Sequence, residues 1–191
     1  MTASGFGPPG AAGLLVDTNL LVLFVVGSVN RDRIETFKRT RKYSKADYDL
    51  LIRVLDRRKI YTVPHVLAEV SNLTDLAGAE KALSRSVLKE TISLLDEVQI
   101  PSTRAAEDRL YWNLGLTDAA IGGVARTHNC NVLTDGLDLY LELTPDRINV
   151  WNFTIFGRAR GGSELERNSW PDAPRRLGGS EGEAALRSLV S

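Results

Sequence analysis

Four acidic residues stand at positions from which a folded chain could bring them together. Asp17 ends a short apolar run that predicts a buried strand, and Asp135 ends a second run of the same kind. Glu69 lies in a helical stretch that follows another predicted strand, and Asp118 falls in the first turn of a later helix. If the strands form a parallel sheet, their carboxyl ends share one edge, and we expect the carboxylates to converge there.

A cluster of carboxylates is unfavourable on its own, because like charges a few ångströms apart raise one another's pKa. Oxygen ligands of this kind select hard divalent cations such as Mg²⁺ or Mn²⁺. A cation held there could position a water molecule for in-line attack on a phosphodiester. The alternative is that Asp17 or Thr18 only caps the helix that follows, since Asp-Thr-Asn is good capping chemistry.

Strands and helices alternate along the chain, which predicts an α/β domain with a mostly parallel sheet. We expect strands at residues 14–17, 60–63, 98–100, 131–134 and 148–151, the last at an edge of the sheet. We expect helices over about 19–26, 45–59, 64–73, 79–96, 101–115 and 117–125. Ser44 and Asp47 predict a capping box, Pro64 suits a first helical turn, and Thr117 is a predicted cap.

The charge balance excludes a chain-wide basic field. Among 191 residues, 24 are Lys or Arg and 24 are Asp or Glu, so any nucleic-acid contact must come from a local patch. An insertion at about residues 30–45 is strongly basic and predicts such a patch, although a solvated face is the alternative. The candidates for phosphate contact are Lys38, Arg39, Arg41 and Lys42.

The length predicts one domain, over residues 14–157, with a Gly- and Pro-rich flexible lead-in at 1–13 and a poorly ordered tail at 158–191. The single cysteine, Cys130, excludes an internal disulfide and fits a reducing compartment. No apolar run is long enough to span a membrane, and the first residues lack the basic start of a secretory signal. We therefore expect a cytoplasmic protein without a membrane partner.

Four short motifs resemble, in order, those of the PIN-domain nucleases. They are Leu15-Val16-Asp17-Thr18-Asn19, Val63-Pro64-His65-Val66-Leu67-Ala68-Glu69-Val70, Thr117-Asp118-Ala119-Ala120-Ile121 and Val132-Leu133-Thr134-Asp135. The resemblance covers about residues 13–155. It implies a PIN-like (Rossmann-like) three-layer α/β/α fold around a central, mostly parallel sheet of about four to five strands. It also implies cleavage of RNA that depends on a divalent metal ion, Mg²⁺ or Mn²⁺.

Position by position, the resemblance implies that Asp17, Glu69 and Asp118 are metal-site acids with a catalytic role. It implies that Asn19 and Thr134 are polar residues that support the site.

The fourth acid departs from the pattern of the family. PIN nucleases often have Thr-x-Asp after the strand, and Gly136 stands at the third of these positions. We assign the fourth metal-site and catalytic acid to Asp135, one residue earlier. Asp138, two residues later, is the alternative and is otherwise expected to support the site.

The function implied by the resemblance is that of an endoribonuclease. The family includes the compact toxins of bacterial toxin–antitoxin pairs, so an RNA substrate, an antitoxin protein and a homodimer are the expected partners. The basic insertion makes this chain longer than those toxins. One alternative is a catalytically weak PIN fold that binds RNA or serves in assembly. A more distant one is a phosphatase with Asp17 as nucleophile, although haloacid-dehalogenase-type phosphatases would have an aspartate where Asn19 stands.

Overall fold

The computed structural model describes residues 13–56 and 58–158. The predicted lead-in and tail therefore lie outside the described residues, except for Gly13 and Arg158. The elements are β1 (Leu14–Val16), α1 (Thr18–Val29), η1 (Arg31–Arg33), α2 (Lys45–Leu55), β2 (Ile60–Thr62), α3 (Pro64–Leu73), α4 (Ala79–Leu94), β3 (Asp96–Glu97), α5 (Ser102–Ala106), α6 (Tyr111–Leu114), α7 (Leu116–His128), β4 (Asn131–Thr134), α8 (Leu137–Leu143), η2 (Thr144–Asp146), β5 (Val150–Asn152) and α9 (Phe153–Arg158).

The strands confirm the predicted α/β class. Within the described residues they form one five-stranded sheet in the order β3-β2-β1-β4-β5, and every neighbouring pair is parallel. The register aligns Val16 of β1 with Leu133 of β4, so Asp17 and Thr134 come next to each other where the two strands end. After β1 the chain continues to β2, on one side of β1 in the strand order, and after β4 it continues to β5, in the opposite direction along the sheet. The topological switch point, where ligands gather in such sheets, therefore lies between β1 and β4.

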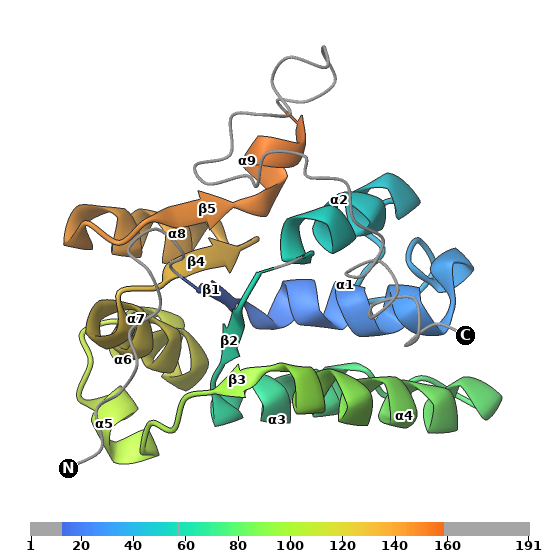
Figure 1. The fold of residues 1–191 in the computed structure, drawn as a ribbon, viewed down its shortest axis with the longest axis horizontal. Coiled ribbons are helices and arrows are strands. Elements are labelled where there is room, and N and C mark those ends of the chain that lie inside the picture. The colour runs from blue at the N-terminus through green and yellow to red at the C-terminus, as the bar shows by residue number, and fades with distance from the viewer. Residues whose placement is uncertain (1–12, 57, 159–191) are drawn as a thin grey trace.

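The helices cover the sheet from both sides, as in a Rossmann-like arrangement. Figure 1 shows α1 to α4 on one side of the strands and α5 to α8 on the other. The central helix α1 is buried from Leu20 to Gly27, because its apolar residues occupy every face and it packs against α2, α3 and α4. Among the described residues, none of the helices combines the length and the apolar character needed to cross a membrane.

Several local predictions are confirmed. β1, β2 and β4 lie within one residue of their predicted bounds, β5 is an edge strand, and Pro64 occupies the first turn of α3. The capping box at the start of α2 is also present. The Ser44 hydroxyl accepts the Asp47 N–H at 3.2 Å, and the Asp47 carboxylate accepts the Ser44 N–H at 2.7 Å.

Two predicted elements are wrong. The strand expected at 98–100 is instead Asp96–Glu97, because pairing with β2 fixes its place and the last ladder bond runs from Val98 N–H to β2. The single helix expected over 101–115 is broken into α5 and α6. Between them the Asp108 carboxylate accepts the Leu110 N–H at 3.0 Å, a local turn that competes with helical hydrogen bonds.

The capping box yields a first prediction. We expect Ser44→Ala to lower the free energy of unfolding by about 1 kcal/mol, because the Asp47 N–H loses its acceptor. Urea denaturation measures this change. Ser93→Ala is the matched control, since Ser93 is exposed within α4 and, among the described residues, its hydroxyl bonds only to the Lys89 carbonyl of its own helix. Equal effects of the two substitutions would contradict a capping role for Ser44.

Candidate active site

A pocket of about 420 Å³ opens at the carboxyl ends of β1 and β4, at the switch point of the sheet. We call it the acidic pocket. Its walls come from the start of α1, from α3, from the turn between α6 and α7, and from the start of α8. It is lined by Asp17, Thr18, Asn19, Glu69, Leu73, Asn113, Leu114, Gly115, Leu116, Thr117, Asp118, Gly136, Asp138 and Leu139.

Asp17 is the most buried acid of the pocket, at 6% exposed. The Thr134 hydroxyl donates to its carboxylate at 2.8 Å, and the backbone N–H groups of Thr18 and Asp135 also donate to it. Thr134 in turn accepts the N–H of Gly136 at 2.9 Å, which leaves its own hydrogen directed at Asp17. Burial raises the pKa of Asp17 above its ordinary value, while the three donors oppose this rise.

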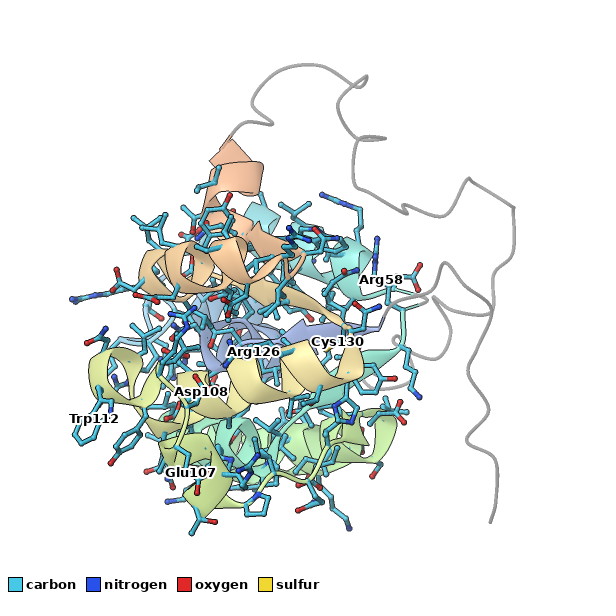
Figure 2. All side chains as sticks on the ribbon, turned by 90° about the vertical axis from the view of Figure 1, so that its left-hand side faces the viewer. Arg58, Glu107, Asp108, Trp112, Arg126 and Cys130 are labelled. Carbon is cyan, nitrogen blue, oxygen red and sulfur yellow. The ribbon has the colours of Figure 1, made fainter. Side chains whose placement is uncertain are left out.

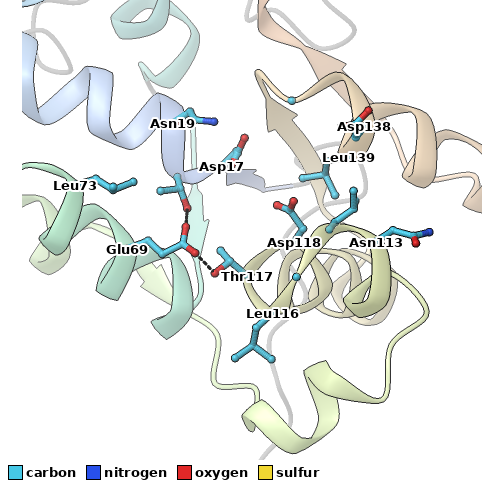
Figure 3. A pocket seen from close by; sticks show the side chains of 14 residues that line it. Asp17, Asn19, Glu69, Leu73, Asn113, Leu116, Thr117, Asp118, Asp138 and Leu139 are labelled. Carbon is cyan, nitrogen blue, oxygen red and sulfur yellow. Dashed lines mark hydrogen bonds between the residues drawn. The ribbon is translucent and has the colours of Figure 1, made fainter. Parts of the chain in front are cut away.

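Glu69 joins three elements through two hydroxyl groups. One carboxylate oxygen accepts from Thr18 at 3.0 Å and the other accepts from Thr117 at 2.6 Å, so α3 is tied to the starts of α1 and α7 (Figure 3). The prediction that Thr117 caps its helix is wrong. The N-cap is Gly115, whose φ of 90° is easy only for glycine, and the Thr117 hydroxyl reaches Glu69 instead.

Asp118 is half-buried in the first turn of α7 and faces the same space as Asp17 (Figure 3). Burial first, and then the negative charges of Asp17, Glu69 and Asp138, together raise the pKa of Asp118 to about 7. At neutral pH this carboxyl group therefore exchanges readily between its charged and neutral forms. Carboxyl groups with such a pKa are typical of functional sites.

The structure places Asp138, and not Asp135, on the wall of the acidic pocket. Asp135, predicted as the fourth metal-site acid, therefore does not line the pocket, whereas the alternative Asp138 does. Thr134 points toward Asp17, and adjacent residues at a strand end point to opposite sides, so Asp135 turns away. Its carboxylate instead accepts hydrogen bonds from Lys42, Tyr43 and Thr154. Asp138 lies across the pocket in the first turn of α8 (Figure 3).

The four cations predicted to contact nucleic acid are all exposed on residues 31–45, which we call the basic segment. Lys42 forms an ion pair with Asp135 and is therefore already neutralised. Among the described residues, none of Lys38, Arg39 and Arg41 has a carboxylate within ion-pair distance. Asp135 directly precedes the pocket residue Gly136, so the Lys42 end of the segment lies beside the acidic pocket.

A group of ion pairs positions the wall formed by the α6–α7 turn. Arg126 of α7 pairs with Asp108 and Asp146, and Arg109 pairs with Glu142 and Asp146. Figure 2 shows Asp108 and Arg126 next to each other along α7. These pairs join the turn before α6 to α7, to the end of α8 and to η2, and so hold the pocket wall against the rest of the domain.

The acidic pocket offers carboxylate oxygens, the ligand type that a hard divalent cation prefers. In the described part of the chain, no group of three or more His, Cys, Asp or Glu side chains is arranged so that it could hold a metal ion. Mg²⁺, however, keeps several of its waters and is commonly bound through one or two carboxylates together with substrate phosphates. Asp17 and Asp118 face the same space and would be the direct ligands, while Glu69 and Asp138 would act through water.

Comparison with known proteins adds no assignment to this geometry. No protein-family model matches the chain, no curated protein matches its sequence, and no solved structure matches its fold. The likeness to PIN nucleases therefore rests on the four sequence motifs alone.

Sequence reasoning did not find the partners of Glu69 and Asp135. The hydroxyl groups of Thr18 and Thr117 reach Glu69 from 51 and 48 residues away, and Tyr43 reaches Asp135 from 92 residues away. A threonine or tyrosine in these positions carries no local signal for such a contact. Only the folded chain shows that these hydroxyl groups surround the acids.

Because the pKa of Asp118 is raised, we expect the protein to become more stable when this carboxylate is replaced by a neutral side chain. Between pH 4 and pH 7 the folded protein holds a proton on Asp118 that the unfolded chain releases, so this group lowers stability as the pH rises. We expect Asp118→Asn to raise the free energy of unfolding by about 1–3 kcal/mol at pH 8 without divalent metal, and to change it little at pH 4. Denaturation at both pH values, with exposed Glu90→Gln as control, measures this difference. A loss of stability at pH 8 would contradict the electrostatic reading.

Removal of the Thr134 hydroxyl is expected to lower the free energy of unfolding, in contrast to the gain expected for Asp118→Asn. Thr134→Val removes a donor from the buried Asp17 carboxylate and an acceptor from Gly136, so we expect a loss of about 1–3 kcal/mol. Thr62→Val is a matched control at the end of β2. Thr62 is fully buried as well, and among the described residues its hydroxyl has no hydrogen-bond partner. Urea denaturation measures the free energy of unfolding of both variants, and we expect Thr62→Val to leave it little changed or to raise it. Equal losses of stability in Thr62→Val and Thr134→Val would contradict the role of Thr134.

Proposed function

We propose that this protein is a Mg²⁺- or Mn²⁺-dependent endoribonuclease with a PIN-like fold. The observation that carries the proposal is the convergence of four acids on one pocket at the switch point. Asp17 follows β1, and the other three acids come from α3, α7 and α8 as Glu69, Asp118 and Asp138. The described residues that line this pocket include no Lys, Arg or His, so a cation from solution would balance their charge.

The acids would have different roles, because their surroundings differ. Asp17 is fixed by three donors and would hold the cation in one position. Asp118 would release its proton when positive charge arrives, because its pKa of about 7 reflects burial and the neighbouring acids. A bound divalent cation would supply charge to stabilise the phosphate under attack and would activate a water molecule. Glu69 would keep α7 in place, and Asn19 would offer an amide at the rim.

The substrate is proposed to be RNA held by its backbone. Lys38, Arg39 and Arg41 are exposed, carry no ion-pair partner among the described residues, and belong to a segment that reaches the edge of the pocket. Contacts of this kind give affinity without reading the base sequence. Since the net charge of the chain is zero, this local patch would be the main electrostatic attraction for a nucleic acid.

Cleavage of a labelled single-stranded RNA tests the proposal. We expect the wild-type protein to cut in Mn²⁺ and to stop cutting in EDTA. Asp17→Asn and Asp118→Asn should each lower the rate on the order of 100-fold, because each removes a direct ligand of the cation. Exposed Glu90→Gln should cut like wild type. Cleavage that persists in EDTA, or hydrolysis of a chromogenic phosphomonoester instead of RNA, would overturn the proposal.

The salt dependence of RNA binding tests the basic segment. Each phosphate contact with a single strand contributes about 0.7 to the slope of log K against log salt. Replacing Lys38, Arg39 and Arg41 together by alanine should therefore reduce the slope by about 2, measured by fluorescence anisotropy in EDTA. Lys89→Ala, an exposed lysine on α4, is the control. An unchanged slope in the triple variant would show that RNA binds elsewhere.

A second candidate function follows from the observation that, among the described residues, no group of three or more His, Cys, Asp or Glu side chains is arranged to hold a metal ion. A catalytically weak protein of this fold would bind RNA through the basic segment without cutting it. Binding by wild type with no cleavage in Mn²⁺ would favour this module. The toxin role, the antitoxin partner and the homodimer stay predictions from the resemblance, and light scattering of the purified protein tests the last of them.

A further inference from the structure

We propose that Asp135 is a positioning residue that anchors the basic segment beside the acidic pocket as a preformed phosphate-binding arm. The phosphate part of this inference rests on the proposed function, whereas the anchor rests on contacts alone. Asp135 would then belong to the substrate arm and not to the metal site.

The surroundings of Asp135 are those of an anchor. Its side chain is 3% exposed and receives three side-chain donors from two distant parts of the chain. Lys42 and Tyr43 of the basic segment donate to one carboxylate oxygen, Tyr43 at 2.7 Å, and Thr154 of α9 donates to the other. A buried carboxylate is stable only with such partners, so the fold holds this end of the segment firmly.

The rest of the basic segment alternates between buried and exposed residues. Ile34 and Thr40 are fully buried and Tyr43 is 5% exposed, with its ring edge-on to Phe153 at 6.4 Å. Between these buried positions Lys38, Arg39 and Arg41 face solvent, while the ammonium group of Lys42 pairs with Asp135. The segment is therefore held by its own side chains in one path, with the charges of Lys38, Arg39 and Arg41 outward.

This arrangement has a consequence for substrate affinity. A mobile basic loop loses conformational entropy when it closes on a phosphate backbone, whereas a preformed one has lost that entropy on folding. Asp135 would thus set how tightly RNA is held without touching RNA or the cation. Loosening the anchor should weaken substrate binding and leave the chemical step intact.

Limited trypsin digestion of the native full-length protein tests the anchor without any need for activity. Tyr43→Phe removes one hydroxyl and keeps the buried ring, and Asp135→Asn removes the charge. We expect cleavage after Lys38, Arg39, Arg41 and Lys42, followed by mass spectrometry, to become roughly tenfold faster in both variants, because local opening becomes easier. The matched control is Tyr48→Phe, which loses a hydrogen bond to Ser28 from an equally buried ring. Cleavage at the wild-type rate in Tyr43→Phe and Asp135→Asn would overturn the anchor.

RNA cleavage kinetics test the functional half. We expect Asp135→Asn and Tyr43→Phe to raise KM roughly tenfold, with kcat within about twofold of wild type and unchanged Mn²⁺ affinity. Asp138→Asn, a change within the pocket, should instead weaken Mn²⁺ binding. If Asp135→Asn lowers kcat and Mn²⁺ affinity at an unchanged trypsin rate, Asp135 is a metal-site acid and the inference is wrong. If wild type cuts no RNA, the proposed function fails, while the trypsin result still decides the anchor.

Discussion

The site depends on the hydrogen bond from Thr134 to Asp17. Burial of the Asp17 carboxylate, which is 6% exposed, is unfavourable unless a hydrogen-bond donor lies beside it. Such a donor is available because β1 and β4 end at the same level. The Thr134 hydroxyl then reaches Asp17, and its own orientation is fixed by the N–H of Gly136. The parallel pairing of these two strands thus sets the position of the acid around which the pocket is built.

Around Asp17 the described pocket lining contains further carboxylates and no positively charged side chain that would neutralise them. Glu69 is held by two neutral hydroxyls, and burial together with the neighbouring acids raises the pKa of Asp118 to about 7. Such an arrangement lowers the stability of the protein without metal. Natural proteins commonly carry destabilising features of this kind where function requires them. Stability would return when a cation balances the charge, which links folding to ligand binding.

Thr134 and Asp135, which are neighbours at the end of β4, face opposite directions and have different hydrogen-bond partners. Thr134 faces the acidic pocket, whereas Asp135 faces Tyr43 and the basic segment. The side chain of Asp135 thus points away from the pocket although its backbone N–H reaches Asp17, and Asp138 on α8 lies on the pocket wall instead. The anchor and the pocket share one strand end, so the charged arm and the candidate metal site keep a fixed relation to each other.

The sequence by itself determined the class of the fold, and it predicted Asp17, Glu69 and Asp118 as site acids, which the structure brings to one pocket. Apolar runs, the capping box at Ser44 and the alternation of strands and helices are local signals, and they placed most elements correctly. The strand β3, the break between α5 and α6 and the change from Asp135 to Asp138 were decided only by tertiary structure. Pairing with β2, a side-chain turn and the alternation of side chains at a strand end are relations between residues that local sequence patterns do not encode.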